Sequence, residues 1–144
     1  IGAVLLLTNS YIVEMCGVVD SDGVLIEDSL PGQTNILTGS VIAQGDDDGI
    51  DTANCNFTVE HCIIRNWNNP LEDSKGISLA AGEARVRHCL LVDNAIGISG
   101  KGGKVSVAFM PTQPGIIKVE IQNKKACNTQ RIGVVGVVQP PVTG

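Results

Sequence analysis

Two stretches of the sequence, GIDTANCNFTVEHC at residues 49–62 and GISLAAGEARVRHC at residues 76–89, decide the fold. Both begin with glycine and isoleucine and end with histidine and cysteine. Gly49 and Cys62 are therefore as far apart as Gly76 and Cys89. Self-similarity with a period of roughly 20 to 50 residues indicates a repeat architecture. The two stretches predict consecutive copies of one structural unit.

The repeat includes more of the chain when four segments are aligned on the reference residues Ser10, Ser40, Cys62 and Cys89. Three columns of mostly apolar residues lie at fixed offsets of −5, −3 and +2 from these positions. The columns contain Leu5, Asn35, Phe57 and Ala84; then Leu7, Leu37, Val59 and Val86; then Ile12, Ile42, Ile64 and Leu91. Alternation at −5 and −3 is the period of a strand, and the change to an even offset indicates a bend at the reference residue.

A second short motif, glycine followed by an aliphatic residue, recurs once per unit. Its copies are Gly23-Val24, Gly49-Ile50, Gly76-Ile77 and Gly97-Ile98. A unit with one small apolar stripe cannot bury that stripe alone, whereas stacked units form a continuous core. We therefore predict an all-β chain coiled as a parallel β-solenoid. A β-sandwich is the alternative, but it requires no constant offset between successive strands.

The pattern changes near Gly103, so we expect a β-helix over residues 1–103 and a separate segment over residues 104–144. Val105, Val107 and Met110 are spaced to begin one more rung, but Pro111 and Pro114 then interrupt the ladder because proline cannot donate to it. Two further strands are expected within residues 115–121 and 131–138. This segment is interpreted as a short C-terminal β-strand cap over the open end of the coil, or as a partial immunoglobulin-like segment.

Composition excludes several classes of partner. The net charge of −5 gives the chain no electrostatic reason to approach the phosphate backbone of nucleic acid, where binding depends on clustered Lys and Arg. Its longest apolar run, residues 3–7, is too short for membrane insertion, which needs about 20 residues. The five cysteines show no metal or redox spacing and do not settle the compartment. Because the chain begins at Ile1, we expect a processed or excised piece.

Three short runs carry a family resemblance: DDDGID at residues 46–51, DSKGIS at residues 73–78 and IGISGK at residues 96–101. They resemble runs on successive turns of bacterial secreted right-handed parallel β-helix proteins of the pectate-lyase-like superfamily. The resemblance covers about residues 38–102. It implies a right-handed parallel β-helix and a secreted or cell-surface location. It does not fix an activity, because members of that superfamily include lyases, hydrolases and adhesins.

The nearest enzyme pattern is that of polygalacturonases. Asp47-Asp48-Gly49 is similar to one of their acidic motifs, but Ser74-Lys75-Gly76 stands where their histidine motif would fall, and the chain has no Arg-Ile-Lys triplet. The leading hypothesis is therefore a non-catalytic structural or glycan-associated module, with polysaccharide or neighbouring subunits as partners. One alternative is a polysaccharide hydrolase or lyase that uses Asp46, Asp48 and Asp73. Another is a fragment of a larger adhesin.

An acidic column precedes the repeating glycines by three residues. It contains Asp20, Asp46, Asp73 and Asn94. Stacked rungs lie about 4.8 Å apart, so Asp20, Asp46 and Asp73 would suit a Ca²⁺ ion or a pair of catalytic acids. The alternative is that Asp and Asn simply favour turns before glycine. One residue before the glycines, Asp48 and Lys75 are expected to form an exposed ion pair of little energetic value.

The remaining candidates are a histidine pair, a cysteine pair and one tryptophan. His61 and His88 share an offset and predict a solvent-facing ladder; a nucleophile or zinc site with the adjacent cysteines is the alternative. Cys62 and Cys89 are expected to be reduced core residues. Trp67 and Asn68 lie in a polar loop and are candidates for binding a sugar ring, unless Trp67 folds over the flank of the coil.

Overall fold

A computed structural model describes residues 4–17, 21–102, 104–108, 117–125 and 128–136 of the 144-residue chain, with the backbone alone described for 107–108, 117–125 and 128–136. All regular structure in this part of the chain is β. The strands are β1 (Leu6–Thr8), β2 (Tyr11–Met15), β3 (Val24–Glu27), β4 (Asn35–Thr38), β5 (Val41–Gly45), β6 (Asp48–Glu60), β7 (Ile63–Arg65), β8 (Lys75–Arg87), β9 (Leu90–Val92), β10 (Ile96–Gly100), β11 (Lys104–Ala108), β12 (Ile117–Lys125) and β13 (Asn128–Gly136). No helix among the described residues could cross a bilayer.

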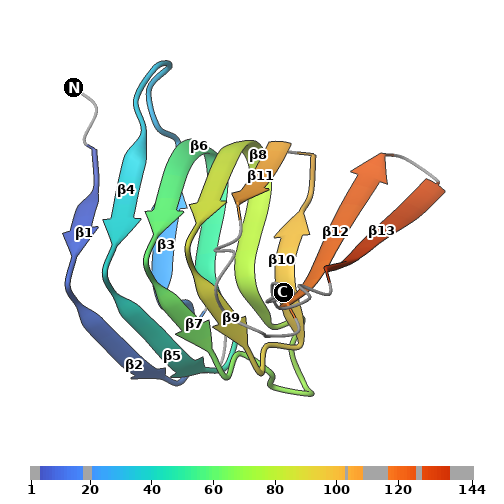
Figure 1. The fold of residues 1–144 in the computed structure, drawn as a ribbon, viewed down its shortest axis with the longest axis horizontal. Coiled ribbons are helices and arrows are strands. Elements are labelled where there is room, and N and C mark those ends of the chain that lie inside the picture. The colour runs from blue at the N-terminus through green and yellow to red at the C-terminus, as the bar shows by residue number, and fades with distance from the viewer. Residues whose placement is uncertain (1–3, 18–20, 103, 109–116, 126–127, 137–144) are drawn as a thin grey trace, which may run out of the picture.

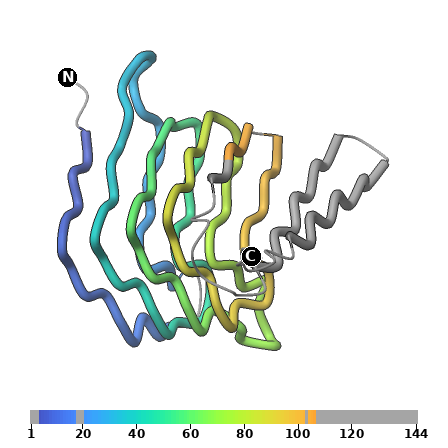
Figure 2. Tube along the Cα trace, viewed as in Figure 1, coloured from blue at the N-terminus to red at the C-terminus, as the bar shows by residue number. Residues whose placement is uncertain are grey.

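The strands form two parallel sheets along the sides of a coil (Figure 1). One sheet has the order β1-β4-β6-β8-β10, with β3 also paired to β6 and β11 also paired to β8. The other sheet has the order β2-β5-β7-β9. Each strand therefore pairs with its counterpart one turn away along the chain, as the trace in Figure 2 shows. The predicted β-solenoid is confirmed.

The register of the sheets confirms the apolar columns. Leu37 pairs with Val59, and Val59 pairs with Val86. On the second sheet, Ile42 pairs with Ile64, and Ile64 with Leu91. The column of the glycine motif is also in register, because Ile50 pairs with Val24 on one side and with Ile77 on the other. Side chains at each offset thus stack on one another, and this stacking fills the core with aliphatic residues.

Three columns of residues with positive φ form the corners of the coil. Their members are Asn9, Gly39, His61 and His88; then Glu14, Gln44, Asn66 and Asp93; then Asp28, Asn54, Ala81 and Gly102. The first column is the bend that the offsets predicted. The other two bends carry no apolar signal and were missed in the sequence. Asn, Asp and Gly are common there because they tolerate the left-handed conformation.

The one polar member of the core columns, Asn35, bridges three backbone or side-chain partners. Its Oδ1 accepts from Leu5 N at 2.9 Å, and its Nδ2 donates to Ser29 Oγ at 2.7 Å and to Asn56 O at 3.2 Å. A buried amide with every hydrogen-bonding group occupied has a much smaller desolvation cost than an unpaired one. Asn35 therefore fits an apolar column and ties three successive turns together.

The coil continues past the boundary expected at Gly103. β11 pairs in parallel with the second half of β8, from Lys104 with Glu83 to Ala108 with Arg87. β12 and β13 form an antiparallel pair, and β12 contacts β10 on the last complete turn. That position is compatible with the predicted cap, which stays a prediction because residues 109–116 and 137–144 lie outside the described part of the chain.

Candidate functional site

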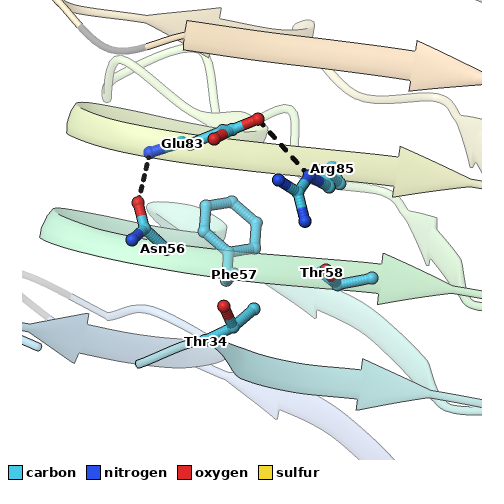
Figure 3. A pocket seen from close by; sticks show the side chains of 6 residues that line it. All are labelled: Thr34, Asn56, Phe57, Thr58, Glu83 and Arg85. Carbon is cyan, nitrogen blue, oxygen red and sulfur yellow. Dashed lines mark hydrogen bonds and ion pairs between the residues drawn. The ribbon is translucent and has the colours of Figure 1, made fainter. Parts of the chain in front are cut away.

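A small hollow lies on the outward face of the larger sheet, across β6, β8 and Thr34, the residue that precedes β4 (Figure 3). Its lining residues are Thr34, Asn56, Phe57, Thr58, Glu83 and Arg85. Apart from Phe57, which is buried beneath, all of them are polar. They alternate along the strands with core residues, so their side chains face solvent.

Hydrogen bonds between neighbouring rungs hold the polar groups of the hollow. Asn56 Oδ1 accepts from Glu83 N at 3.0 Å. The Glu83 carboxylate in turn accepts from Arg85 Nε at 3.3 Å, and Lys104 Nζ lies 3.9 Å from the same oxygen. Donors and acceptors are thus fixed on one face before any ligand binds. These residues were not predicted as a site from the sequence, although they occupy the positions that alternate with the aligned apolar columns.

A second cluster consists of three carboxylates just before the repeating glycines. Oxygens of Asp22, Asp47 and Asp48 lie within 4.8 Å of one another. Asp22 Oδ1 accepts from Asp48 N at 3.1 Å, which links the two turns. Asp48 is buried, whereas Asp22 and Asp47 are half-buried.

Lys75, on the next turn, pairs with one carboxylate of this cluster, that of Asp48. Its Nζ lies 3.4 Å from Asp48 Oδ1 and 3.2 Å from Asp73 Oδ2, and it also donates to the Asp73 carbonyl. The side chains of Lys75 and Asp48 are only 3% and 6% exposed. The expectation that the Asp48–Lys75 ion pair is exposed is therefore wrong. The register prediction was right, since Asp48 pairs with Lys75, but both side chains are covered.

The proposed acids and cation ligands have separate partners. Asp46 Oδ2 accepts from Gly17 N at 3.1 Å, while the Asp73 carboxylate is 73% exposed and pairs with Lys75. Asp20 lies outside the described residues. Within that part of the chain, the acids that converge are therefore Asp22, Asp47 and Asp48 rather than the predicted set. The calcium hypothesis for Asp20, Asp46 and Asp73 stays a prediction.

Trp67 is a structural residue rather than an exposed sugar platform. It is fully buried, its Nε1 donates to Ile42 O at 3.3 Å, and a Cβ at Gly45 or Gly49 would overlap its ring. The sugar-binding expectation for Trp67 is corrected, because an indole sealed against glycine backbone cannot stack on a ligand. Asn68 is exposed, and its role in binding a sugar stays a prediction.

The histidines and cysteines lie at one corner but do not converge. The rings of His61 and His88 stack with centroids 5.2 Å apart, which confirms the ladder. Cys62 and Cys89 are free thiols that donate to backbone carbonyls, at 3.3 Å to Glu60 O and 3.1 Å to Arg87 O. Among the described residues, no zinc-like set of histidine and cysteine ligands forms.

Comparison with known proteins rests on a family model. The model described as "Right handed beta helix region" matches residues 4–109. The chain belongs to the right-handed β-helix family. The searches of curated proteins and of solved structures found no significant match. The family accounts for the coil through β11 and leaves the activity of this β-helix open.

The chemistry of the Asp48 carboxyl follows from its burial. Burial raises the pKa of Asp48 to about 6, Lys75 opposes this increase, and the charges of Asp47 and Asp51 add to it. For Lys75, burial alone would lower the pKa, but the carboxylates of Asp48 and Asp73 raise it overall. At neutral pH the two groups thus form a buried ion pair.

We expect the stability of the β-helix to depend on pH through Asp48. Because the pKa is raised on folding, the folded state binds the proton more tightly, so the contribution is present below pH 4 and lost as the pH rises to about 6. Relative to Asp48→Asn, the wild type should lose about 3 kcal/mol between these limits. Urea unfolding of both proteins across the range measures this; parallel curves would contradict it.

The cysteines give a second expected result. Cys62 is 1% exposed, and the side-chain interaction between the two cysteines lowers the pKa of Cys62 to about 7 and raises that of Cys89. Burial thus protects Cys62, and protonation protects Cys89. In the folded protein, a disulfide-exchange reagent should label the exposed Cys16 and spare both. Mass mapping of rapid labelling at Cys62 or Cys89, or of a bridge between them, would overturn this expectation.

Proposed function

We propose that this chain is a non-catalytic, extracellular or cell-surface β-helical module that binds polysaccharide on the outward face of its larger sheet. The observation that carries the proposal is the polar hollow across β6 and β8. A sugar hydroxyl both donates and accepts hydrogen bonds. The hollow offers an amide at Asn56, a hydroxyl at Thr58, a carboxylate at Glu83 and a guanidinium at Arg85, all on one face.

The order of these groups supports binding without large rearrangement. Glu83 is held by Arg85 and by its own backbone bond to Asn56. Fixing donors and acceptors in advance lowers the entropy lost on binding. Charge-assisted hydrogen bonds from Glu83 and Arg85 to hydroxyls would be the strongest contacts, because hydrogen bonds to ionised groups exceed neutral ones.

The repeating geometry of the face favours an extended ligand over a small one. Asn56, Glu83 and Lys104 form one row across three rungs, and Thr58, Arg85 and Ser106 form the next. Successive members of each row are separated by the strand spacing of about 4.8 Å. A linear polymer can contact several rungs of such a face, whereas the hollow itself is too shallow to enclose a compact molecule.

The buried ion pair favours binding over catalysis. A general acid or nucleophile must reach the substrate, but Asp48 lies beneath the surface and is paired with Lys75. The second candidate function, a polysaccharide hydrolase or lyase, is favoured by one observation: the pKa of Asp48 near 6 suits a general acid. In that case Asp48→Asn would abolish turnover.

A glycan array of neutral and acidic polysaccharides tests the proposal. The affinity for each glycan that binds is then measured by titration for the wild type and for Asn56→Ala, Arg85→Ala and Arg87→Ala. Arg87 is the matched control, because it is exposed to the same extent on the same strand, pairs with Glu60 and lies outside the hollow. We expect Arg85→Ala to weaken binding about tenfold, the scale of one central contact.

The Arg87→Ala control shows whether a loss of glycan binding in Arg85→Ala is specific to the hollow. Arg87→Ala should bind like the wild type, because its guanidinium does not reach the hollow. Equal losses in Arg85→Ala and Arg87→Ala would show that binding depends on charge alone and would place the ligand elsewhere. An absence of binding to every glycan would overturn the proposed function.

A further inference from the structure

One corner of the coil carries two matched imidazoles whose role the proposed function does not use. His61 connects β6 to β7, and His88 occupies the same corner one turn later. Both are exposed, with φ of 53° and 51°. Their rings stack at a centroid distance of 5.2 Å with an interplanar angle of 25°. Backbone geometry therefore presents two imidazoles side by side to solvent.

The nitrogen atoms of both rings are available as ligands. In the described part of the chain, the interaction recorded for each ring is the stacking itself. The neighbouring ionisable groups already have partners: Glu60 pairs with Arg87 at 3.2 Å, and the two adjacent thiols donate to backbone carbonyls. Neither His61 nor His88 is thus engaged by the acid or the base beside it.

We propose that His61 and His88 together bind one divalent transition-metal ion through a nitrogen of each ring. Imidazole suits Zn²⁺, Cu²⁺ and Ni²⁺, and neutral rings provide lone pairs without a buried charge. Water completes the coordination, because the corner is open to solvent. The site is distinct from the carboxylate cluster of Asp22, Asp47 and Asp48, which shares no residue with it.

The stacked geometry converts to coordination by small side-chain rotations. Metal–nitrogen bonds are about 2.0 to 2.1 Å long, so the two donor atoms must approach more closely than the ring centres do now. Exposed side chains rotate on the picosecond to nanosecond scale without disturbing the backbone. The corner itself stays fixed, because His61 N donates to Arg87 O at 3.2 Å across the rungs.

Titration of the full chain with Ni²⁺ tests the site, because Ni²⁺ does not oxidise thiols as Cu²⁺ does. Isothermal calorimetry should show one ion per chain, and the melting temperature should rise with Ni²⁺ because the ion binds the folded state. His61→Asn and His88→Asn are the test variants. Asparagine preserves the corner, since Asn9 occupies the same column with φ of 48°.

Each single variant should bind Ni²⁺ about 100-fold more weakly, because the second ligand acts at a high effective concentration. Cys16 is the exposed thiol among the described residues, so Cys16→Ser is the control variant and should bind like the wild type. Affinity unchanged in either asparagine variant would overturn the proposal, as would binding that disappears in Cys16→Ser. Circular dichroism of each variant without metal should match the wild type, which separates loss of a ligand from loss of the fold.

Discussion

The Ile64→Asp protein is expected to be unfolded at neutral pH. Ile64 is 0% exposed and stacks between Ile42 and Leu91 in the smaller sheet. A carboxylate at this position would lose its hydration without gaining a partner, at a cost of several kcal/mol, comparable to the total stability of about 5–15 kcal/mol typical of a domain. Circular dichroism and urea unfolding measure the loss.

Ile63→Asp is the matched control for that change. Ile63 is adjacent on β7 but points outward and is 37% exposed. The same carboxylate there remains hydrated, so stability should change by less than about 1 kcal/mol. If Ile64→Asp retained the stability of the wild type, or if Ile63→Asp were the more damaging change, the register of the sheet would be wrong.

The second large effect is expected for Lys75→Met. Removal of the ammonium leaves the Asp48 carboxylate buried beside Asp22 and Asp47. Loss of one partner from a buried ion pair typically costs about 3–5 kcal/mol, because the other charge stays uncompensated. Lys75→Met should therefore be strongly destabilised at pH 7. Because Lys75 lowers the pKa of Asp48, the pKa should rise further in Lys75→Met, so the deficit should shrink as the pH falls from 7 and be largely gone below about pH 6.

A double variant separates charge from packing. Asp48→Asn in the Lys75→Met background removes the orphaned carboxylate, so it should restore much of the lost stability. Urea unfolding at pH 7 and pH 5 gives the comparison. A double variant no more stable than Lys75→Met would show that the ammonium itself, or the methylene chain of Lys75, carries the stabilisation.

The core columns could be predicted from the sequence because apolar residues recur at the offsets −3 and +2 in all four segments, and at −5 in all but the segment with Asn35. Leu37, Val59 and Val86 stand at one offset, and the sheet pairs them in that order. Repetition sets the register, since a shift by one residue would turn every apolar side chain outward. The outward position of the residues that line the hollow also follows from strand alternation, since Asn56 and Glu83 occupy equivalent outward positions.

The constant offsets predict which residues stack in a column, but they do not predict which other residues bury that column. The pairing of Asp48 with Lys75 was predicted, but the offsets do not show that both side chains are buried. Trp67, in the segment between β7 and β8, packs against Gly45 and Gly49, where any larger residue would displace it. A glycine column signals close approach of another group, but the sequence does not identify that group as the indole.

Whether this β-helix binds polysaccharide without cleaving it is tested by measuring binding and turnover in one sample. A polysaccharide identified on the array is incubated with the wild type, and bound ligand and released reducing or unsaturated ends are measured together. We expect saturable binding that Arg85→Ala weakens, with no product released above the rate measured without protein. Product release that disappears in Asp48→Asn would contradict this expectation and would identify this β-helix as an enzyme.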